Sequence, residues 1–278
     1  SLNWKDCMFK TKIFNKANPK SITIAQRLTG LIWLQYLLFD NFKEIIFLRK
    51  GTFFNRGLYN FIGNFDFLFS SNFWNSFRIL LFTILVLYIL KLNHKHFFIF
   101  LVLIYFYEMF KKGFGGHIDH RITTLFLFTL ILNISVQGKN QNTQTSLVPP
   151  VCFFFFQYTC IGLARLINGF PELFRDDIFS RWLIQRSMRP NYFELQFGQL
   201  LVENIEGIYL SSLFLILTFV ELFTILLLFT GRKIMRYALV VHILAHLSIF
   251  ILMGINFTEN VLILVMLIYL DRENNDSL

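Results

Sequence analysis

The chain has little of the cysteine that stabilises small secreted domains or zinc modules. It holds three cysteines in 278 residues, Cys7, Cys152 and Cys160, and they form no CxxC pair. A disulfide framework and a cysteine zinc site both need several cysteines at short, regular spacings. The sequence therefore predicts neither.

Charge is also scarce. Charged residues make up 15% of the chain and hydrophobic residues 55%, whereas a soluble domain carries about 25% charge. The net charge of +9 comes from Lys and Arg residues that separate apolar blocks. Nucleic-acid binding needs a continuous basic face on a soluble fold, so we expect membrane lipid, and no nucleic acid, beside these residues.

Long apolar blocks dominate the sequence. A helix needs roughly 20 residues to cross a hydrocarbon core of about 30 Å. We therefore predict an all-α fold, a polytopic transmembrane helical bundle of about eight spans, with seven as the fallback. The expected spans are residues 22–39, 73–92, 96–110, 118–135, 151–168, 207–230, 234–255 and 261–270.

Polar segments divide this bundle. Residues 136–150 read as a linker, because they are polar and close with Pro149 and Pro150. Residues 169–206 mix charges with Phe, Trp and Leu, which predicts interfacial helices between the fifth and sixth spans.

Three domains follow from this reading. Residues 1–20 carry five Lys and are expected to form a basic cytoplasmic segment without a cleavable signal peptide. Residues 21–271 form the transmembrane domain, and residues 272–278 a polar tail. We expect a multi-pass integral membrane protein of the bacterial inner membrane; the Phe-rich, Ala-poor composition keeps an organellar inner membrane as the alternative.

Four ionisable side chains inside the later predicted spans are singled out: Arg165, Glu221, His242 and His246. An ionisable group inside a bilayer is a functional candidate, because it is destabilising unless paired or hydrated. The two histidines are four residues apart and share a helix face, but no third ligand is evident, so we predict no metal site. The alternative is a purely structural ion pair or hydrogen-bonded cluster.

A second polar group opens the fourth span. His117, Asp119 and His120 follow a glycine-rich turn and lie at one membrane boundary. These proton-handling side chains are the catalytic candidates. The competing interpretation is a solvated helix start, with Asp119 favourable near the helix N-terminus.

The order of these features resembles the horizontally transferred transmembrane (HTTM) family, which is related to the membrane domain of vitamin K-dependent gamma-carboxylases. No single motif carries the resemblance, which covers roughly residues 21–271. The matching segments are Gln26-Arg27-Leu28-Thr29-Gly30, His117-Ile118-Asp119-His120, residues 158–166, the Trp182 segment, and Glu221 and His242 followed by residues 253–257.

The resemblance implies a carboxylase only if a lysine base is present. The family's carboxylases use a lysine to deprotonate a reduced quinone, with a histidine that corresponds by position to His120. Arg165 stands where that lysine is expected, and a guanidinium cannot give up its proton in a protein. Gamma-carboxylation is therefore not expected, and the chain is most similar to short, membrane-only bacterial members.

Three functions remain open from the sequence. The first is an HTTM-like protein, with a lipid-like or quinone-like pocket, that assists maturation, export or assembly of a partner polypeptide. The second is a membrane enzyme that acts on a lipid or quinone. The third is an accessory subunit of a larger membrane complex, which predicts no cavity. The sequence leaves the cofactor unknown and does not decide whether the protein is an enzyme.

Overall fold

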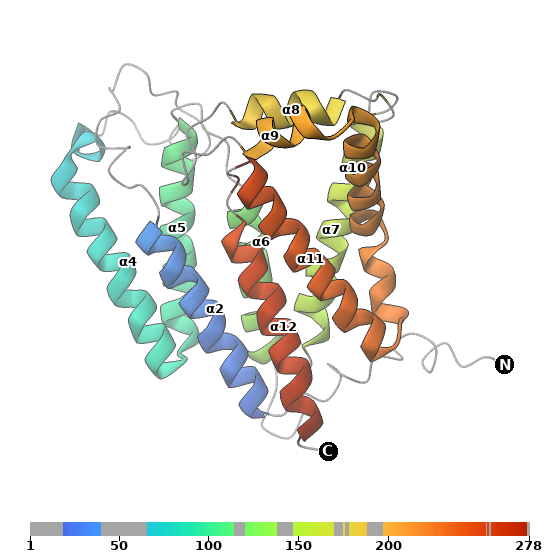
Figure 1. Cartoon of the computed structure of the whole chain (residues 1–278). Coiled ribbons are helices and arrows are strands. Elements are labelled where there is room, and N and C mark those ends of the chain that lie inside the picture. The colour runs from blue at the N-terminus through green and yellow to red at the C-terminus, as the bar shows by residue number, and fades with distance from the viewer. Residues whose placement is uncertain are drawn as a thin grey trace. The chain divides into compact units, whose positions relative to one another are not determined.

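The computed structural model describes most of the helical part of the chain. The described residues are 19–39, 66–113, 120–137, 147–169, 175, 178–187, 197–253, 255 and 257–276. Every regular element within these ranges is helical, as the apolar blocks predict (Figure 1).

All eight segments predicted as spans are helical over most of their length. The helices are α2 (Pro19–Phe39), α4 (Ser71–Lys91), α5 (His94–Gly113), α6 (His120–Gln137), α7 (Val148–Gly169), α10 (Gly207–Leu222), α11 (Arg232–Met253) and α12 (Thr258–Asp276). Shorter helices are η3 (Asp66–Phe69), α8 (Ile178–Ser187), α9 (Phe197–Asn204) and η5 (Thr224–Phe229).

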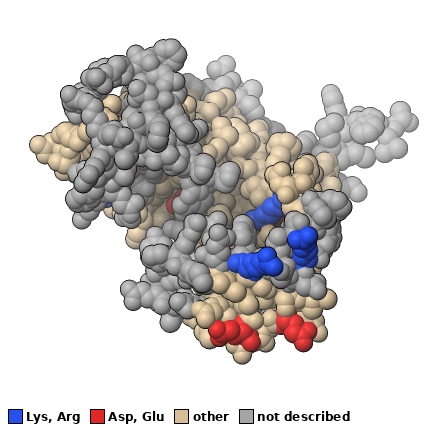
Figure 2. Space-filling model, turned by 90° about the horizontal axis from the view of Figure 1, so that it is seen from above, with Lys and Arg blue, Asp and Glu red and all other residues tan. Residues whose placement is uncertain are grey.

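In the described part of the chain, four helices are long and apolar enough to cross a membrane, and they indicate a membrane protein. They are Lys20–Phe39, Ser71–Lys91, Val148–Gly169 and Lys233–Met253. Large apolar side chains point outward; Tyr237, for example, is 72% exposed. Figure 2, the view from above, shows that the described side chains there are mostly uncharged, with a few Lys, Arg, Asp and Glu among them. A surface of this kind is expected against lipid.

The chain forms two compact units, whose boundary at Thr143 and Gln144 falls within the predicted linker. The N-terminal unit comprises α2, η3, α4, α5 and α6. In it α2 packs on α4 and α6, and α4 packs on α5. The buried indole of Trp33 meets the edge of Phe100 at 5.3 Å between ring centroids.

Buried polar side chains of the N-terminal unit bond to one another. The Asn133 Oδ1 accepts hydrogen bonds from Gln26 Nε2 at 3.1 Å and from the Tyr88 hydroxyl at 3.0 Å. One turn earlier on α6, the Thr129 Oγ1 accepts from the Trp33 indole N–H at 3.1 Å. The N-terminal unit thus joins α2, α4 and α6 through hydrogen bonds of the kind that hold transmembrane helices together.

The C-terminal unit contains the described helices from α7 onward. The helix α7 packs on α10 and η5, and α11 packs on α12. Within this unit α8 and α9 run across the ends of the longer helices (Figure 1). Phe179 and Leu183 of α8 pack with Leu210 of α10 and Met253 of α11 in a buried cluster.

One predicted span is broken. The apolar block 207–230 forms the α-helix α10 and then changes to the 3-10 helix η5, with Phe223 between them. The backbone N–H of Ile225, just after the break, donates to the Thr159 hydroxyl of α7 at 3.0 Å. A change from α to 3-10 within a span often marks a functional position, and this one lies two residues after Glu221.

Candidate functional site

A close helix crossing positions the polar residues of the C-terminal unit. Gly162 of α7 faces α10 so closely that a Cβ there would lie 2.5 Å from the backbone nitrogen of Leu222 and 2.9 Å from the carbonyl oxygen of Thr218. Only glycine leaves room for this approach. Arg165 lies one turn further along α7 and therefore reaches the end of α10.

Arg165 and Glu221 form an ion pair across this crossing. The distance from Arg165 Nη1 to Glu221 Oε2 is 2.6 Å, and the side chains are 26% and 11% exposed. The Arg165 Cζ also lies 5.6 Å from the centroid of the Phe214 ring, a cation–π distance.

His246 is held through both ring nitrogens. Its Nδ1 lies 2.7 Å from the carbonyl oxygen of His242, one turn earlier on α11. A carbonyl only accepts, so Nδ1 carries a proton and donates. In the neutral ring Nε2 then accepts from the Tyr158 hydroxyl, 3.1 Å away. The Tyr158 and Phe257 rings meet the imidazole edge-on.

His242 is held through one ring nitrogen. Its Nε2 lies 3.0 Å from the Thr224 Oγ1. The Thr224 hydroxyl donates its proton to the Val220 carbonyl at 2.8 Å, so Oγ1 is left to accept from His242 Nε2–H. The first residue of η5 thereby fixes a histidine of α11.

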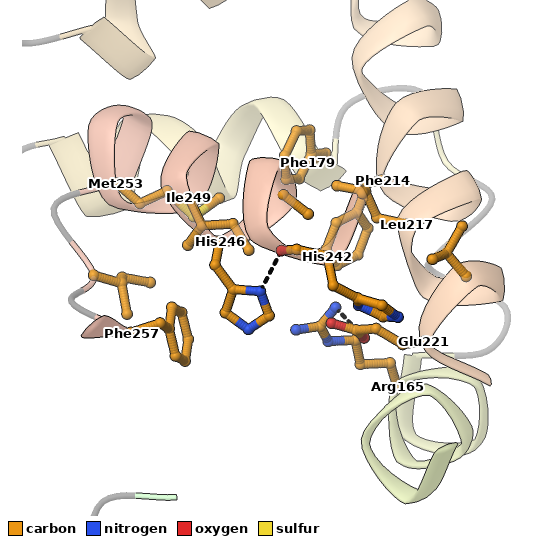
Figure 3. Close-up of a pocket in the computed structure, with 13 residues that line it drawn as sticks. Arg165, Phe179, Phe214, Leu217, Glu221, His242, His246, Ile249, Met253 and Phe257 are labelled. Atoms are coloured by element: carbon orange, nitrogen blue, oxygen red, sulfur yellow. Dashed lines mark hydrogen bonds and ion pairs between the residues drawn. The ribbon is translucent and has the colours of Figure 1, made fainter. Parts of the chain in front are cut away.

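These four side chains line one cavity of about 70 Å³. Figure 3 shows Arg165 and Glu221 turned toward each other, with the His242 ring beside them and His246 turned toward Phe257. Nine apolar residues complete the wall. The structure thus brings together all the predicted polar cluster on a largely apolar cavity. A volume of this size holds a few water molecules or a small part of a ligand.

The predicted catalytic candidates lie elsewhere in the chain. His117 and Asp119 are outside the described residues, and of His120 only the backbone is described, as the first residue of α6. The structure therefore leaves their role a prediction. Within the described ranges no three His, Cys, Asp or Glu residues are arranged to hold a metal ion.

Sequence reasoning missed two members of the site. Tyr158 stood in the run that resembles HTTM proteins, but its bond to His246 could not be read from the sequence, because α7 and α11 are distant in the chain. Thr224 is one hydroxyl in a long apolar block. The helix break that directs it to His242 carries no proline or glycine signal.

Comparison of the chain with protein-family models, with curated proteins and with solved structures gave no match.

Proposed function

We propose that this protein is a multi-pass membrane protein that binds the polar end of a membrane amphiphile at Arg165, Glu221, His242 and His246. The cavity that these residues share is the observation that supports it most. An ion pair inside a bilayer is destabilising unless it is compensated. The pair bridges α7 and α10 and also lines a cavity, which favours ligand binding over a purely structural role.

The cavity also weighs against the accessory-subunit alternative. That alternative predicts no cavity, and apolar faces buried against other chains. Here Phe179, Ile249, Met253 and Phe257 are apolar side chains that face the cavity. They suit an acyl or isoprenoid chain, which can enter from the surrounding lipid.

The membrane arrangement in this proposal has eight spans. Besides the four long apolar helices, α5, α6, α10 with η5, and α12 cross the bilayer, while α8 and α9 lie in its interface. The mixture of charged and apolar residues in the 169–206 segment supports this placement of the short helices α8 and α9. The membrane is a bacterial inner membrane, with an organellar inner membrane as the alternative.

In this proposal the protein is an HTTM-like protein that lacks carboxylase activity and assists the maturation, export or assembly of a partner polypeptide. The Arg165 guanidinium supports the lack of carboxylase activity, since it cannot act as the base that a carboxylase needs. Its engagement with Glu221 points to binding and positioning instead.

A membrane enzyme acting on a lipid or quinone is the second candidate. The hydrogen bonds from Tyr158 to His246 and from His246 to the His242 carbonyl favour it. Such a chain of groups orients imidazoles in the way that proton-transfer sites require.

Native mass spectrometry of protein purified in mild detergent tests ligand binding. The Ala245→Leu variant fills the cavity without removing a polar group, because Ala245 lines the wall. Ala238→Leu makes the same change two turns earlier on α11, where the residue does not line the cavity, and serves as the control. We expect a bound amphiphile on the wild type and on Ala238→Leu, and none on Ala245→Leu.

Equal occupancy in all three proteins, or no bound molecule in any of them, contradicts the proposal. Co-purifying polypeptides are identified from the same samples. Turnover of an added lipid or quinone, lost in Tyr158→Phe, would instead favour the enzyme candidate.

A further inference from the structure

The hydrogen-bonding groups on the cavity wall define which head group fits. The Nε2–H of His242 is committed to Thr224, whose own proton is committed to the Val220 carbonyl. In the neutral ring this leaves Nδ1 as an acceptor. Among the described residues Nδ1 has no hydrogen-bond partner, although His242 is only 2% exposed.

Arg165 supplies the opposite function. A guanidinium has five N–H donors, and in the described part of the chain this one has only Glu221 as a charged partner. The ion pair engages the Nη1 end of the guanidinium, so the remaining N–H groups are able to donate to a ligand. The cavity lining therefore offers an acceptor, His242 Nδ1, beside the donors of Arg165 (Figure 3).

The charges of the side chains that line the cavity cancel. Arg165 contributes one positive charge and Glu221 one negative charge, and the neutral imidazoles contribute none. An anionic head group would approach the Glu221 carboxylate and a cationic one the Arg165 guanidinium. Burying either charge with an incomplete counter-charge is unfavourable, so the site fits an uncharged head.

The size of the cavity narrows the head further. At about 70 Å³ it is about half the volume of an apolar cavity of roughly 150 Å³ that binds benzene. A quinol ring is therefore too large for the enclosed part, whereas a hydroxymethyl end is small enough. The apolar side chains of Ile249, Met253 and Phe257 then surround the first carbons of the chain.

We propose that the ligand is an uncharged amphiphile that ends in a hydroxyl group. Its O–H donates to His242 Nδ1 and its oxygen accepts from the Arg165 guanidinium. This inference rests on the proposed function, because it names the ligand class of the same site. Fatty alcohols, polyprenols and diacylglycerols share this chemistry.

Matched ligands of one chain length test the inference in the intact protein. The probes are 1-hexadecanol, its methyl ether, hexadecanoate and hexadecylamine, each at the same mole fraction in the micelle. The ether accepts but cannot donate, so it isolates the bond to His242. We expect hexadecanol occupancy, read by native mass spectrometry, to exceed that of the other three about tenfold, the effect of one hydrogen bond.

The Thr224→Val variant separates recognition from folding. Without the Thr224 acceptor, the imidazole proton is free to move from Nε2 to Nδ1, which then donates into the cavity. The occupancy ratio of alcohol to ether should fall from about ten to about one, and Thr224→Ser should restore it. A general loss of folding would lower both ligands equally and leave the ratio unchanged.

The possible outcomes distinguish the two proposals. If hexadecanoate, hexadecylamine or the ether binds as well as hexadecanol, the head-group inference fails while amphiphile binding stands. If no probe binds the wild type more than it binds Ala245→Leu, both fail. A diacylglycerol of the same chain length, run in parallel, separates a glycerolipid source from a single-chain alcohol, and preference for either over the charged probes supports the inference.

Discussion

Asn133 of the N-terminal unit and His242 of the C-terminal unit are two buried polar side chains with different hydrogen bonding. In the N-terminal unit Asn133 accepts two hydrogen bonds through Oδ1 and donates one through Nδ2 to the Thr129 carbonyl. In the C-terminal unit His242 uses only Nε2, and Arg165 keeps donors directed at a cavity. The first arrangement is satisfied within the protein. The second leaves one ring nitrogen of His242 without a hydrogen-bond partner among the described residues.

The comparison shows that burial alone does not mark a site inside a membrane protein. Glu108 is as deeply buried as the site histidines, yet it accepts a short hydrogen bond from the Tyr36 hydroxyl in the packed interior of the N-terminal unit. What distinguishes the C-terminal unit is an unused hydrogen-bonding atom on an open volume. Variants that separately change the helix packing, the hydrogen bonds of Asn133 and the tautomer of His242 can test this distinction.

The largest effect is expected from Gly162→Ala in the C-terminal unit. Its Cβ would meet backbone atoms of α10, which cannot move without displacing the helix, so we expect a loss of about 3 kcal/mol, at the upper end for overpacking. Gly30→Ala in the N-terminal unit would meet the Ile89 side chain at 2.6 Å. A side chain shifts more easily than backbone, so about 1 kcal/mol is expected there.

Thermal unfolding in detergent, with soluble protein read by size exclusion, measures both changes. Gly231→Ala is the control, because a Cβ there meets nothing within 4 Å. Equal losses for Gly162→Ala and Gly231→Ala would show that α7 and α10 do not approach as closely as the structure has them.

The fold could be predicted further than the site. Apolar blocks located the long helices that the structure describes, because a bilayer requires helical hydrogen bonding and about 20 apolar residues per crossing. The polar residues Arg165, Glu221, His242 and His246 could be selected from the same pattern, since each interrupts an apolar run. The unit boundary fell within the polar segment that the sequence marks as a linker.

The parts that escaped prediction depend on contacts between distant helices. The change from α10 to η5 has no local signal, and the N–H freed by it is satisfied by Thr159, about 66 residues away in the chain. The role of Gly162 likewise depends on what faces it. A sequence without aligned relatives gives the composition of a helix face but not its partner.

The second largest effect is expected from Asn133→Leu in the N-terminal unit. Gln26 and Tyr88 would lose their shared acceptor, and each buried polar group left unpaired is destabilising, by about 2 kcal/mol in total in a membrane helix bundle. Thermal unfolding measures the loss. Amphiphile occupancy of the surviving folded protein should stay at the wild-type value, because every described residue that lines the cavity belongs to the C-terminal unit.

Ser135→Ala is the matched control for this variant, since it removes only a bond from the Ser135 hydroxyl to the Ile131 carbonyl within α6. A stability loss as small as that of the control would mean that the hydrogen bonds of Asn133 do not hold the N-terminal unit. Loss of the amphiphile from folded Asn133→Leu protein would mean that the site is not confined to the C-terminal unit.

The smallest and most specific effect compares two threonines that each accept from a ring N–H. In Thr129→Val the Trp33 indole loses its acceptor, and because an indole nitrogen can only donate, we expect about 1 kcal/mol of destabilisation. In Thr224→Val the His242 imidazole can move its proton to Nδ1, which faces the cavity and its ligand or water, so a loss of about 0.5 kcal/mol or less is expected. Thermal unfolding of the two valine variants, with the serine variants as controls that keep the hydroxyl, gives the difference directly. Since both substitutions remove the same group from a buried hydrogen bond, an equal loss would show that His242 is as fixed as Trp33, and that the two units bury their polar groups in the same way after all.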